Sequence, residues 1–129
     1  MQKQIRAVEK FHKTFGLSVN KAPIVALSEE TKVLRYRLMH EENEEYLQAV
    51  KDNDLTEVAD ALGDMLYILC GTIITHGMQD IIEEVFDEIQ ASNMSKLGAD
   101  GKPIYRDDGK VMKGPNYFKP NFERILKQD

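Results

Sequence analysis

Apolar residues recur three or four positions apart in four long segments of the chain, which is the spacing of an amphipathic helix. In the first segment, Ile5, Val8 and Phe11 share one side. Short links between long amphipathic helices place neighbouring helices antiparallel. We therefore predict an all-α protein, folded as an antiparallel four-helix bundle. The four predicted helices cover residues 3–14, 28–51, 54–76 and 79–95.

The pattern changes after Lys96, where half of the eight glycines lie. Residues 103–112 read as a small β-hairpin with Asp108-Gly109 at its turn. A two-stranded ribbon is not stable alone, so we expect it to lie on the bundle or on a partner subunit. We predict a single domain over residues 1–129. It comprises the helical bundle (1–97) and a hairpin with a tail (98–129).

The composition is that of a globular protein, with 129 residues of which 42% are hydrophobic and 30% are charged. The first residues lack the apolar segment of a signal peptide. The most apolar stretch, residues 58–75, carries Asp60 and Asp64, which a membrane span rarely tolerates. The single cysteine, Cys70, allows neither an internal disulfide nor a cysteine-cluster zinc site. We expect a cytoplasmic protein that does not associate with a membrane.

The net charge of −5 argues against a nucleic-acid-binding protein, which usually has a basic excess. The charge is unevenly distributed, because residues 29–90 contain sixteen acidic and only four basic side chains. An acidic helix surface that serves solubility explains this pattern in one way. A cation site flanked by groups that hold a polyanion explains it in another.

Acidic residues occupy the apolar side of the second predicted helix. At about 100° per residue, Glu41, Glu42 and Glu45 fall on the same stripe as Leu38 and Ala49. Three carboxylates on a core stripe need a cation or strong hydrogen-bond donors, because a bare buried charge is very unfavourable.

The third predicted helix repeats the pattern, with Glu57, Asp60 and Asp64 forming one acidic ridge. The rest of this helix is apolar on nearly all sides, so we expect the helix to be buried and its ridge to face the acids of the second helix. Ligands that offer only oxygen favour Mg²⁺ or Mn²⁺. The two stripes therefore predict a divalent metal site.

Each acid has a simpler interpretation when it is taken alone. Glu57 lies three residues after Asp54, which is the spacing of a helix cap. Asp64 is compatible with a hydrogen-bonded core acid, and Glu45 with a surface charge. Glu44 falls on the opposite side of its helix and reads as solvated. Only the combination of the acids on two facing stripes favours the metal site.

Two motifs in these helices resemble a known family. Glu41-Glu42-Asn43-Glu44-Glu45 matches the pattern EExxE, and Glu57-Val58-Ala59-Asp60 matches the ExxD that follows it. Together they resemble the all-α nucleoside triphosphate pyrophosphohydrolases, the MazG-like superfamily that includes phosphoribosyl-ATP pyrophosphohydrolases and dimeric dUTPases. The sequence Ser-Asn-Met-Ser-Lys over 92–96 and Asp-Gly-Lys-Pro over 100–103 resemble the phosphoribosyl-ATP-pyrophosphohydrolase-like subgroup.

The resemblance implies a Mg²⁺-dependent enzyme that hydrolyses a nucleoside triphosphate to the monophosphate and pyrophosphate. It also implies a homodimer or homotetramer. Asn93 and Lys96 correspond to residues that contact the nucleotide or its phosphates, and Asp64 lies outside the motif as a supporting acid. By position, the metal ligands are Glu41, Glu42, Glu45, Glu57 and Asp60.

The required chemistry suggests further roles. A carboxylate that the metal does not fully use, Glu42 or Glu45, is a candidate base for the attacking water. Basic groups must stabilise the transferred phosphoryl group and the leaving pyrophosphate. Lys96 and Lys110 are the candidates, whereas Arg106 and Lys113 read as solubilising charges.

Three functions remain compatible with the sequence. The first is a Mg²⁺-dependent pyrophosphohydrolase that removes dUTP or non-standard nucleotides from the nucleotide pool. The second is the phosphoribosyl-ATP pyrophosphohydrolase of histidine biosynthesis. The third is a non-catalytic helical oligomer that binds nucleotides or serves a structural role.

Overall fold

The computed structural model describes residues 1–127, and this part of the chain is all-α with no β-strand. The chain divides into two compact units, Met1–Asp80 and Ile81–Asp129. The predicted all-α class is confirmed. The four-helix bundle is not confirmed, because the fourth helix belongs to the second unit. The helices are α1 (Gln2–Phe15), α2 (Glu29–Lys51), α3 (Leu55–Thr75), α4 (Ile82–Met94) and α5 (Glu123–Leu126).

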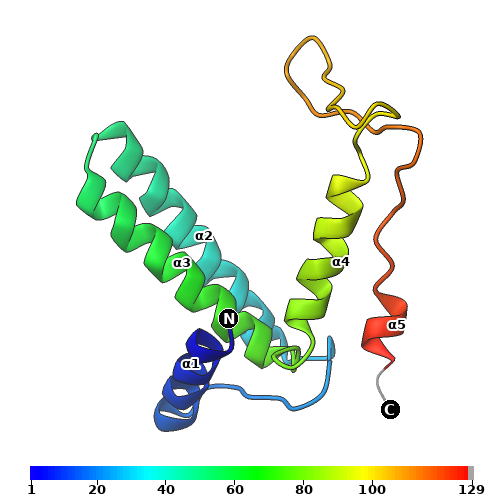
Figure 1. Cartoon of the computed structure of the whole chain (residues 1–129). Coiled ribbons are helices and arrows are strands. Elements are labelled where there is room, and N and C mark those ends of the chain that lie inside the picture. Colours follow the sequence, from blue (N-terminus) through cyan, green and yellow to red (C-terminus); the bar gives the residue numbers. More distant parts are fainter. Residues whose placement is uncertain (128–129) are drawn as a thin grey trace. The chain divides into compact units, whose positions relative to one another are not determined.

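Helices α2 and α3 form the antiparallel pair at the centre of the first unit (Figure 1). Both begin at the residues that the sequence predicted. The Ser28 hydroxyl accepts a hydrogen bond from the backbone N–H of Thr31 at 3.1 Å, and the Asp54 carboxylate accepts one from Glu57 N–H at 3.1 Å. Such caps satisfy N–H groups that a helix start otherwise leaves unpaired. The short link at residues 52–54 then turns the chain back, so that the two acidic stripes run side by side.

Helix α1 packs against the second half of α3. Ile5 and Val8 of α1 are buried, as are Cys70 and Ile74 of α3. The loop that follows α1 stays on this core, where its backbone donates hydrogen bonds to the last carbonyls of α3. Gly77 allows this close approach, because its φ is 67° and a Cβ there would lie 2.0 Å from a backbone oxygen of the loop. The core of the unit therefore lies at one end of the α2–α3 pair.

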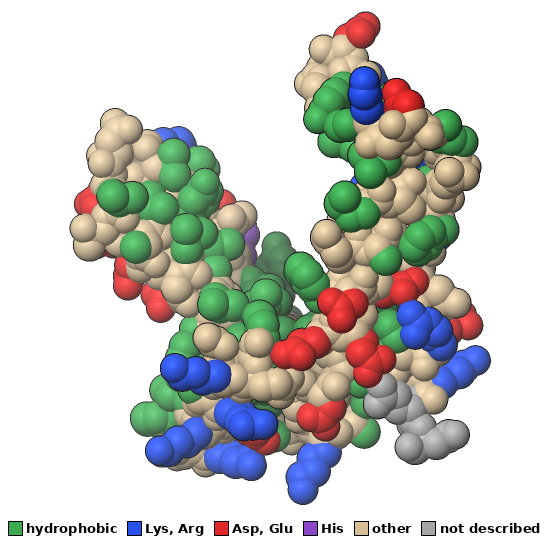
Figure 2. All heavy atoms as spheres, in the orientation of Figure 1, with side chains coloured by type: hydrophobic (Ala, Val, Ile, Leu, Met, Phe, Trp, Pro, Cys, Tyr) green, Lys and Arg blue, Asp and Glu red, His purple; other side chains and the backbone are tan. Residues whose placement is uncertain are grey.

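The other end of the pair is far more exposed than the sequence suggested. The expectation that the third helix is buried on most sides is wrong before Cys70, where Leu62, Leu66 and Leu69 are 51%, 42% and 41% exposed. Apolar side chains accordingly cover much of the visible surface of the α2–α3 pair (Figure 2). Within residues 1–127, α3 is also the one helix whose length and hydropathy match a membrane span, a test that core helices of soluble proteins pass as well.

In the second unit, the tail folds back onto α4. The hydroxyl of Ser92 donates to Phe118 O at 2.9 Å, and Phe118 N–H donates to Ser95 Oγ at 3.1 Å. Further along, Glu88 accepts hydrogen bonds from Asn121 N–H and from the Arg124 guanidinium. These four contacts lie along one side of α4 and hold the tail to it.

The predicted hairpin is only partly present. The chain does turn at Gly109, whose φ is 86°, and Arg106 N–H donates to Lys110 O at 2.8 Å. Pairing stops at one isolated antiparallel bridge between Tyr105 and Val111, and no strand forms among the described residues. All the side chains from 101 to 113 are exposed, so the segment has no packed surface on which longer pairing is stabilised.

Candidate metal centre

Carboxylates from α2 and α3 converge where the two acidic stripes meet. Glu42, Glu45 and Asp64 each place one carboxylate oxygen within 4.8 Å of the others. Glu42 and Glu45 are neighbours on one face of α2, because they lie three residues apart. Asp64 reaches them from α3, and the negative charge of Asp60 also acts on Glu42. The structure therefore brings together four of the predicted acids.

The Glu42 carboxyl lies in an environment that disfavours its charge. Burial raises its pKa to about 7, and the hydrogen bond with Glu45 and the charges of Glu45, Asp64 and Asp60 act in the same direction. A hydrogen bond between two carboxyl groups requires a proton on one of them. The cluster thus retains a proton near neutral pH, and a cation in the same place would replace it.

One oxygen of Glu42 has no partner. Within residues 1–127, the Oε2 atom is shielded from solvent and no hydrogen bond reaches it. Buried polar atoms are nearly always satisfied, so an oxygen without a partner among carboxylates is a position that a cation or a water would satisfy. Since the nearby donors are all carboxylate oxygens, they suit a hard divalent ion such as Mg²⁺ or Mn²⁺.

A hollow of about 350 Å³ opens beside the cluster. Glu57 lines it even though this residue belongs to the helix cap, because the cap uses only its backbone N–H. The cap interpretation therefore leaves the Glu57 carboxylate available for a ligand. The full lining consists of Glu45, Gln48, Ala49, Asp52, Glu57 and Asp60.

Other predicted site residues lie outside this group. Glu41 is exposed and lines neither the cluster nor the hollow, so its role as a ligand stays a prediction. Asn93, Lys96 and Lys110 belong to the second unit. Asn93 and Lys110 are exposed, whereas Lys96 is half-buried and its carbonyl accepts a hydrogen bond from Gly114 N–H. Their roles in binding substrate also stay predictions.

Sequence reasoning missed Arg35, which is only 7% exposed and belongs to the contact between α2 and α3. Its position gave a signal, because Arg35 lies seven residues, or about two helical turns, before Glu42. The serines of the Ser-Asn-Met-Ser-Lys segment were also missed as structural residues. Both Ser92 and Ser95 hold the tail of the second unit.

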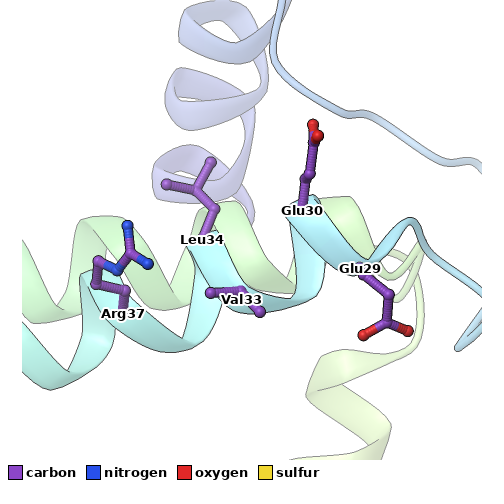
Figure 3. Close-up of a pocket in the computed structure, with 5 residues that line it drawn as sticks. All are labelled: Glu29, Glu30, Val33, Leu34 and Arg37. Carbon is purple, nitrogen blue, oxygen red and sulfur yellow. The ribbon is translucent and has the colours of Figure 1, made fainter.

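A second hollow, of about 410 Å³, lies near the start of α2. Figure 3 shows that all five of its lining residues project from this one helix. It mixes charges of both signs with apolar side chains, unlike the purely acidic cluster. It is a surface feature of α2, separate from the metal centre. The lining consists of Glu29, Glu30, Val33, Leu34 and Arg37.

Comparison with known proteins identifies a family, a viral relative and similar solved structures. The pattern of the phosphoribosyl-ATP pyrophosphohydrolase family matches residues 8–93. The uncharacterized protein L479 of Acanthamoeba polyphaga mimivirus is 39% identical over 69 residues, which are 51% of this chain and only 28% of the viral protein. The crystal structure of a proposed NTP pyrophosphohydrolase from Exiguobacterium sp. 255-15 is 27% identical with a TM-score of 0.50, and the match covers 96% of this chain and 91% of that one. The family match spans α2 and α3 completely and so includes every acid of the cluster.

Proposed function

Because the chain belongs to the phosphoribosyl-ATP pyrophosphohydrolase family, we propose that it hydrolyses a nucleoside triphosphate to the monophosphate and pyrophosphate. The superfamily identified from the two acidic motifs is confirmed. The family consists of hydrolases that act on phosphoric anhydrides, which is the enzyme class expected from the sequence. The observation that carries the proposal is the unpartnered Glu42 oxygen within the acidic cluster.

Mg²⁺ is the proposed cofactor, with Mn²⁺ as a substitute. A triphosphate is strongly anionic, so a cluster of carboxylates repels it unless a cation lies between them. When bound, the ion neutralises charge, orients the phosphates and lowers the pKa of a bound water. The proposed ligands are Glu41, Glu42, Glu45, Glu57 and Asp60, with Asp64 as an additional acid.

The side chains of the protein then have distinct tasks. Glu42 or Glu45 accepts the proton of the attacking water, because a carboxylate that the metal does not fully use is free to act as a general base. Attack of water on either the α- or the β-phosphorus breaks the same α–β anhydride bond and gives the same two products. Asn93, Lys96 and Lys110 are the proposed contacts to the nucleotide and its phosphates.

The proposed role is the removal of dUTP or non-standard nucleotides from the nucleotide pool. Hydrolysis of phosphoribosyl-ATP is the second candidate, and the name of the matching family favours it. A non-catalytic helical oligomer that binds nucleotides or serves a structural role is the third candidate. The number of acids counts against it, because a protein that only binds a nucleotide needs fewer metal ligands.

We also propose that the chain acts in the cytoplasm as a homodimer or homotetramer. The exposed leucines on α3 support the assembly, because soluble monomers rarely leave so many large apolar side chains together at the surface. The proposed single domain includes both compact units, and an antiparallel four-helix bundle is its proposed arrangement. Light scattering coupled to gel filtration tests the assembly, and a monomeric mass at micromolar concentration contradicts it.

The decisive experiment measures pyrophosphate release from a panel of NTPs, dNTPs and phosphoribosyl-ATP, with Mg²⁺ and with a chelator. Mg²⁺-dependent release from one or a few substrates confirms the reaction and identifies the substrate. Release only from phosphoribosyl-ATP favours the second candidate. No release from any substrate by folded protein that binds metal favours the third.

A further inference from the structure

Arg35 is a buried cation that the proposed chemistry does not use. Its Nη2 donates a hydrogen bond to the backbone oxygen of Ile68 at 2.9 Å, and its Nε donates one to Thr72 Oγ1 at 3.1 Å. Thr72 Oγ1 in turn donates to the same Ile68 oxygen at 2.9 Å. The guanidinium thus donates hydrogen bonds to two acceptors that lie one turn apart on α3.

These contacts are a poor arrangement for stability alone. Burial lowers the pKa of Arg35, and both acceptors are neutral oxygens that do not balance the positive charge. Buried charges are costly, and apolar side chains of similar volume often stabilise a core equally well or better. The guanidinium instead constrains geometry. Its rigid, planar set of donors can reach both acceptors only at one axial position of α2 relative to α3.

The surrounding residues fix the position of the Arg35 side chain along α3. A Cβ at Gly71 would lie 2.6 Å from Arg35 Nη2 and 2.7 Å from His12 Nε2, so only glycine leaves room for both side chains. His12 comes from α1, is 2% exposed, and is held by a 2.8 Å hydrogen bond between its Nδ1 and Ser18 O. Side chains from α1 and α2 therefore meet over a single position of α3.

The Arg35 hydrogen bonds and the acidic cluster both depend on the same register of α2 against α3. Glu42 lies seven residues after Arg35 on α2, about 10.5 Å along the helix. On α3, Asp64 lies four residues before Ile68 and eight before Thr72, about 6 and 12 Å away. Both steps lead to the same level, where the carboxylates of Glu42 and Asp64 converge. A slip of one turn, about 5.4 Å, separates them.

We propose that Arg35 is a positioning residue for the metal centre. Its hydrogen bonds to Ile68 O and Thr72 Oγ1 set the register of α2 against α3 that brings Glu42 and Glu45 close to Asp64. This proposal rests on the proposed function only in that it takes the acidic cluster to be a cation site. Arg35 itself touches neither the metal nor the nucleotide.

The test compares Arg35→Met with Arg37→Met, a matched loss of an exposed arginine two residues away on the same helix. The first readout is the affinity for Mn²⁺ alone, followed by electron paramagnetic resonance. We expect Arg35→Met to weaken Mn²⁺ binding about 10- to 100-fold, the range for residues that orient metal ligands. Arg37→Met should bind Mn²⁺ like the wild type. Because the Arg35 charge is costly to bury, the melting temperature of Arg35→Met should fall little or even rise.

Two further variants sharpen the result. Arg35→Lys keeps the charge but loses the fork, so it should recover only part of the Mn²⁺ affinity. Thr72→Val removes one of the two acceptors and should weaken binding less than Arg35→Met does. If Arg35 and Thr72 act through the same hydrogen bond, adding Thr72→Val to Arg35→Met should cause no further loss of Mn²⁺ affinity. Should Arg35→Met fail to fold, Arg35→Lys and Thr72→Val decide the question.

Turnover separates this proposal from the proposed function. We expect a lower kcat in Arg35→Met at saturating Mg²⁺ and nucleotide, with KM for the nucleotide changed less. Folded Arg35→Met with wild-type Mn²⁺ affinity overturns the positioning role, whatever the enzyme turns over. If the wild type releases no pyrophosphate, the proposed function fails, yet the Mn²⁺ titrations still decide the role of Arg35.

Discussion

Two glutamates, one in each compact unit, show how differently the chain uses the same side chain. Glu88 on α4 accepts hydrogen bonds from Asn121 N–H at 3.0 Å and from Arg124 at 2.8 Å, and these partners lower its pKa. Glu42 on α2 has acids as neighbours, a pKa raised to about 7, and one buried oxygen without a partner in the described chain. Both residues lie on amphipathic helices, and both are partly buried.

The difference separates a structural acid from a candidate functional one. The negative charge of Glu88 is balanced within its own unit, where it holds the tail against the helix. The charge of the Glu42 cluster is unbalanced and concentrated, an arrangement that costs folding free energy and that a bound cation relieves. Perturbed carboxylates in such clusters are the residues that commonly carry function.

The strongest prediction concerns two acids that line the hollow beside the cluster, Glu45 and Asp60. Glu45→Gln or Asp60→Asn should lower pyrophosphate release by at least about 100-fold, because each removes a charged ligand that the proposed cation needs. Circular dichroism should show an intact fold, since each change removes one negative charge from a group of like charges at an exposed position. A stopped assay of pyrophosphate with the best substrate measures the effect.

Glu44→Gln provides the matched control for these variants. Glu44 adjoins Glu45 in the sequence and is exposed like Glu45, but it belongs to neither the cluster nor the hollow. The same change of charge there should leave turnover within about twofold of the wild type. Full activity in Glu45→Gln excludes that residue from the site, and equal losses in Glu45→Gln and Glu44→Gln point to a general charge effect.

A smaller loss is expected in the second unit. Lys96→Ala should raise KM for the nucleotide or slow turnover by about tenfold, the effect of losing one charged hydrogen bond to a phosphate. Lys102→Ala is the control, since Lys102 is an exposed cation of the same segment. Unchanged kinetics of Lys96→Ala at all substrate concentrations would return Lys96 to the surface charges.

The acidic cluster was predictable from the sequence because it depends on local rules. The caps at Ser28 and Asp54 set where α2 and α3 begin, and the short link between the helices makes them antiparallel. Helical periodicity then places Glu42 and Glu45 on one stripe and Asp64 on the other, so their convergence follows without knowledge of the remaining chain.

Features that depend on distant contacts could not be predicted in this way. The spacing of Arg35 from Glu42 gave a signal, but its burial depends on the α3 carbonyl that it contacts, which helical periodicity does not identify. Leu62 and Leu66 were expected in the core because they are apolar, yet burial requires a partner surface, which periodicity does not supply. The hairpin failed for a similar reason, since turn residues favour a reversal but do not supply packing.

The stability of the metal-free protein should depend on pH through Glu42. Its folded pKa, about 7, lies above the ordinary value of 4.5, so the stability it contributes is complete below about pH 4.5 and is lost as pH rises through about 7. In chelator, the melting temperature of both proteins is compared at pH 4.5 and above pH 7. We expect the fall between these pH values to be about 2–5 °C larger in the wild type than in Glu42→Gln.

Saturating Mg²⁺ should reduce this difference, because the ion takes the place of the retained proton. Melting curves of wild type and Glu42→Gln at several pH values, with chelator and with Mg²⁺, measure both effects. The difference between the two proteins isolates Glu42 from other groups that titrate in the same range. An identical pH profile in the two metal-free proteins contradicts the perturbed carboxyl.

The smallest predicted effect lies at Glu88, where the sign of the pH dependence is reversed. The lowered pKa means that Glu88 stabilises the tail above its ordinary pKa and that this contribution disappears as pH falls through its folded value. Glu88→Ala should make the Asn121 amide exchange its hydrogen a few-fold faster, about threefold, since that amide loses its acceptor. The Phe118 amide is an internal control, because Ser95 holds it independently. Equal loss of protection at both amides would show that the tail opens as one piece, so that the balanced charge of Glu88 secures the whole tail and not only its end.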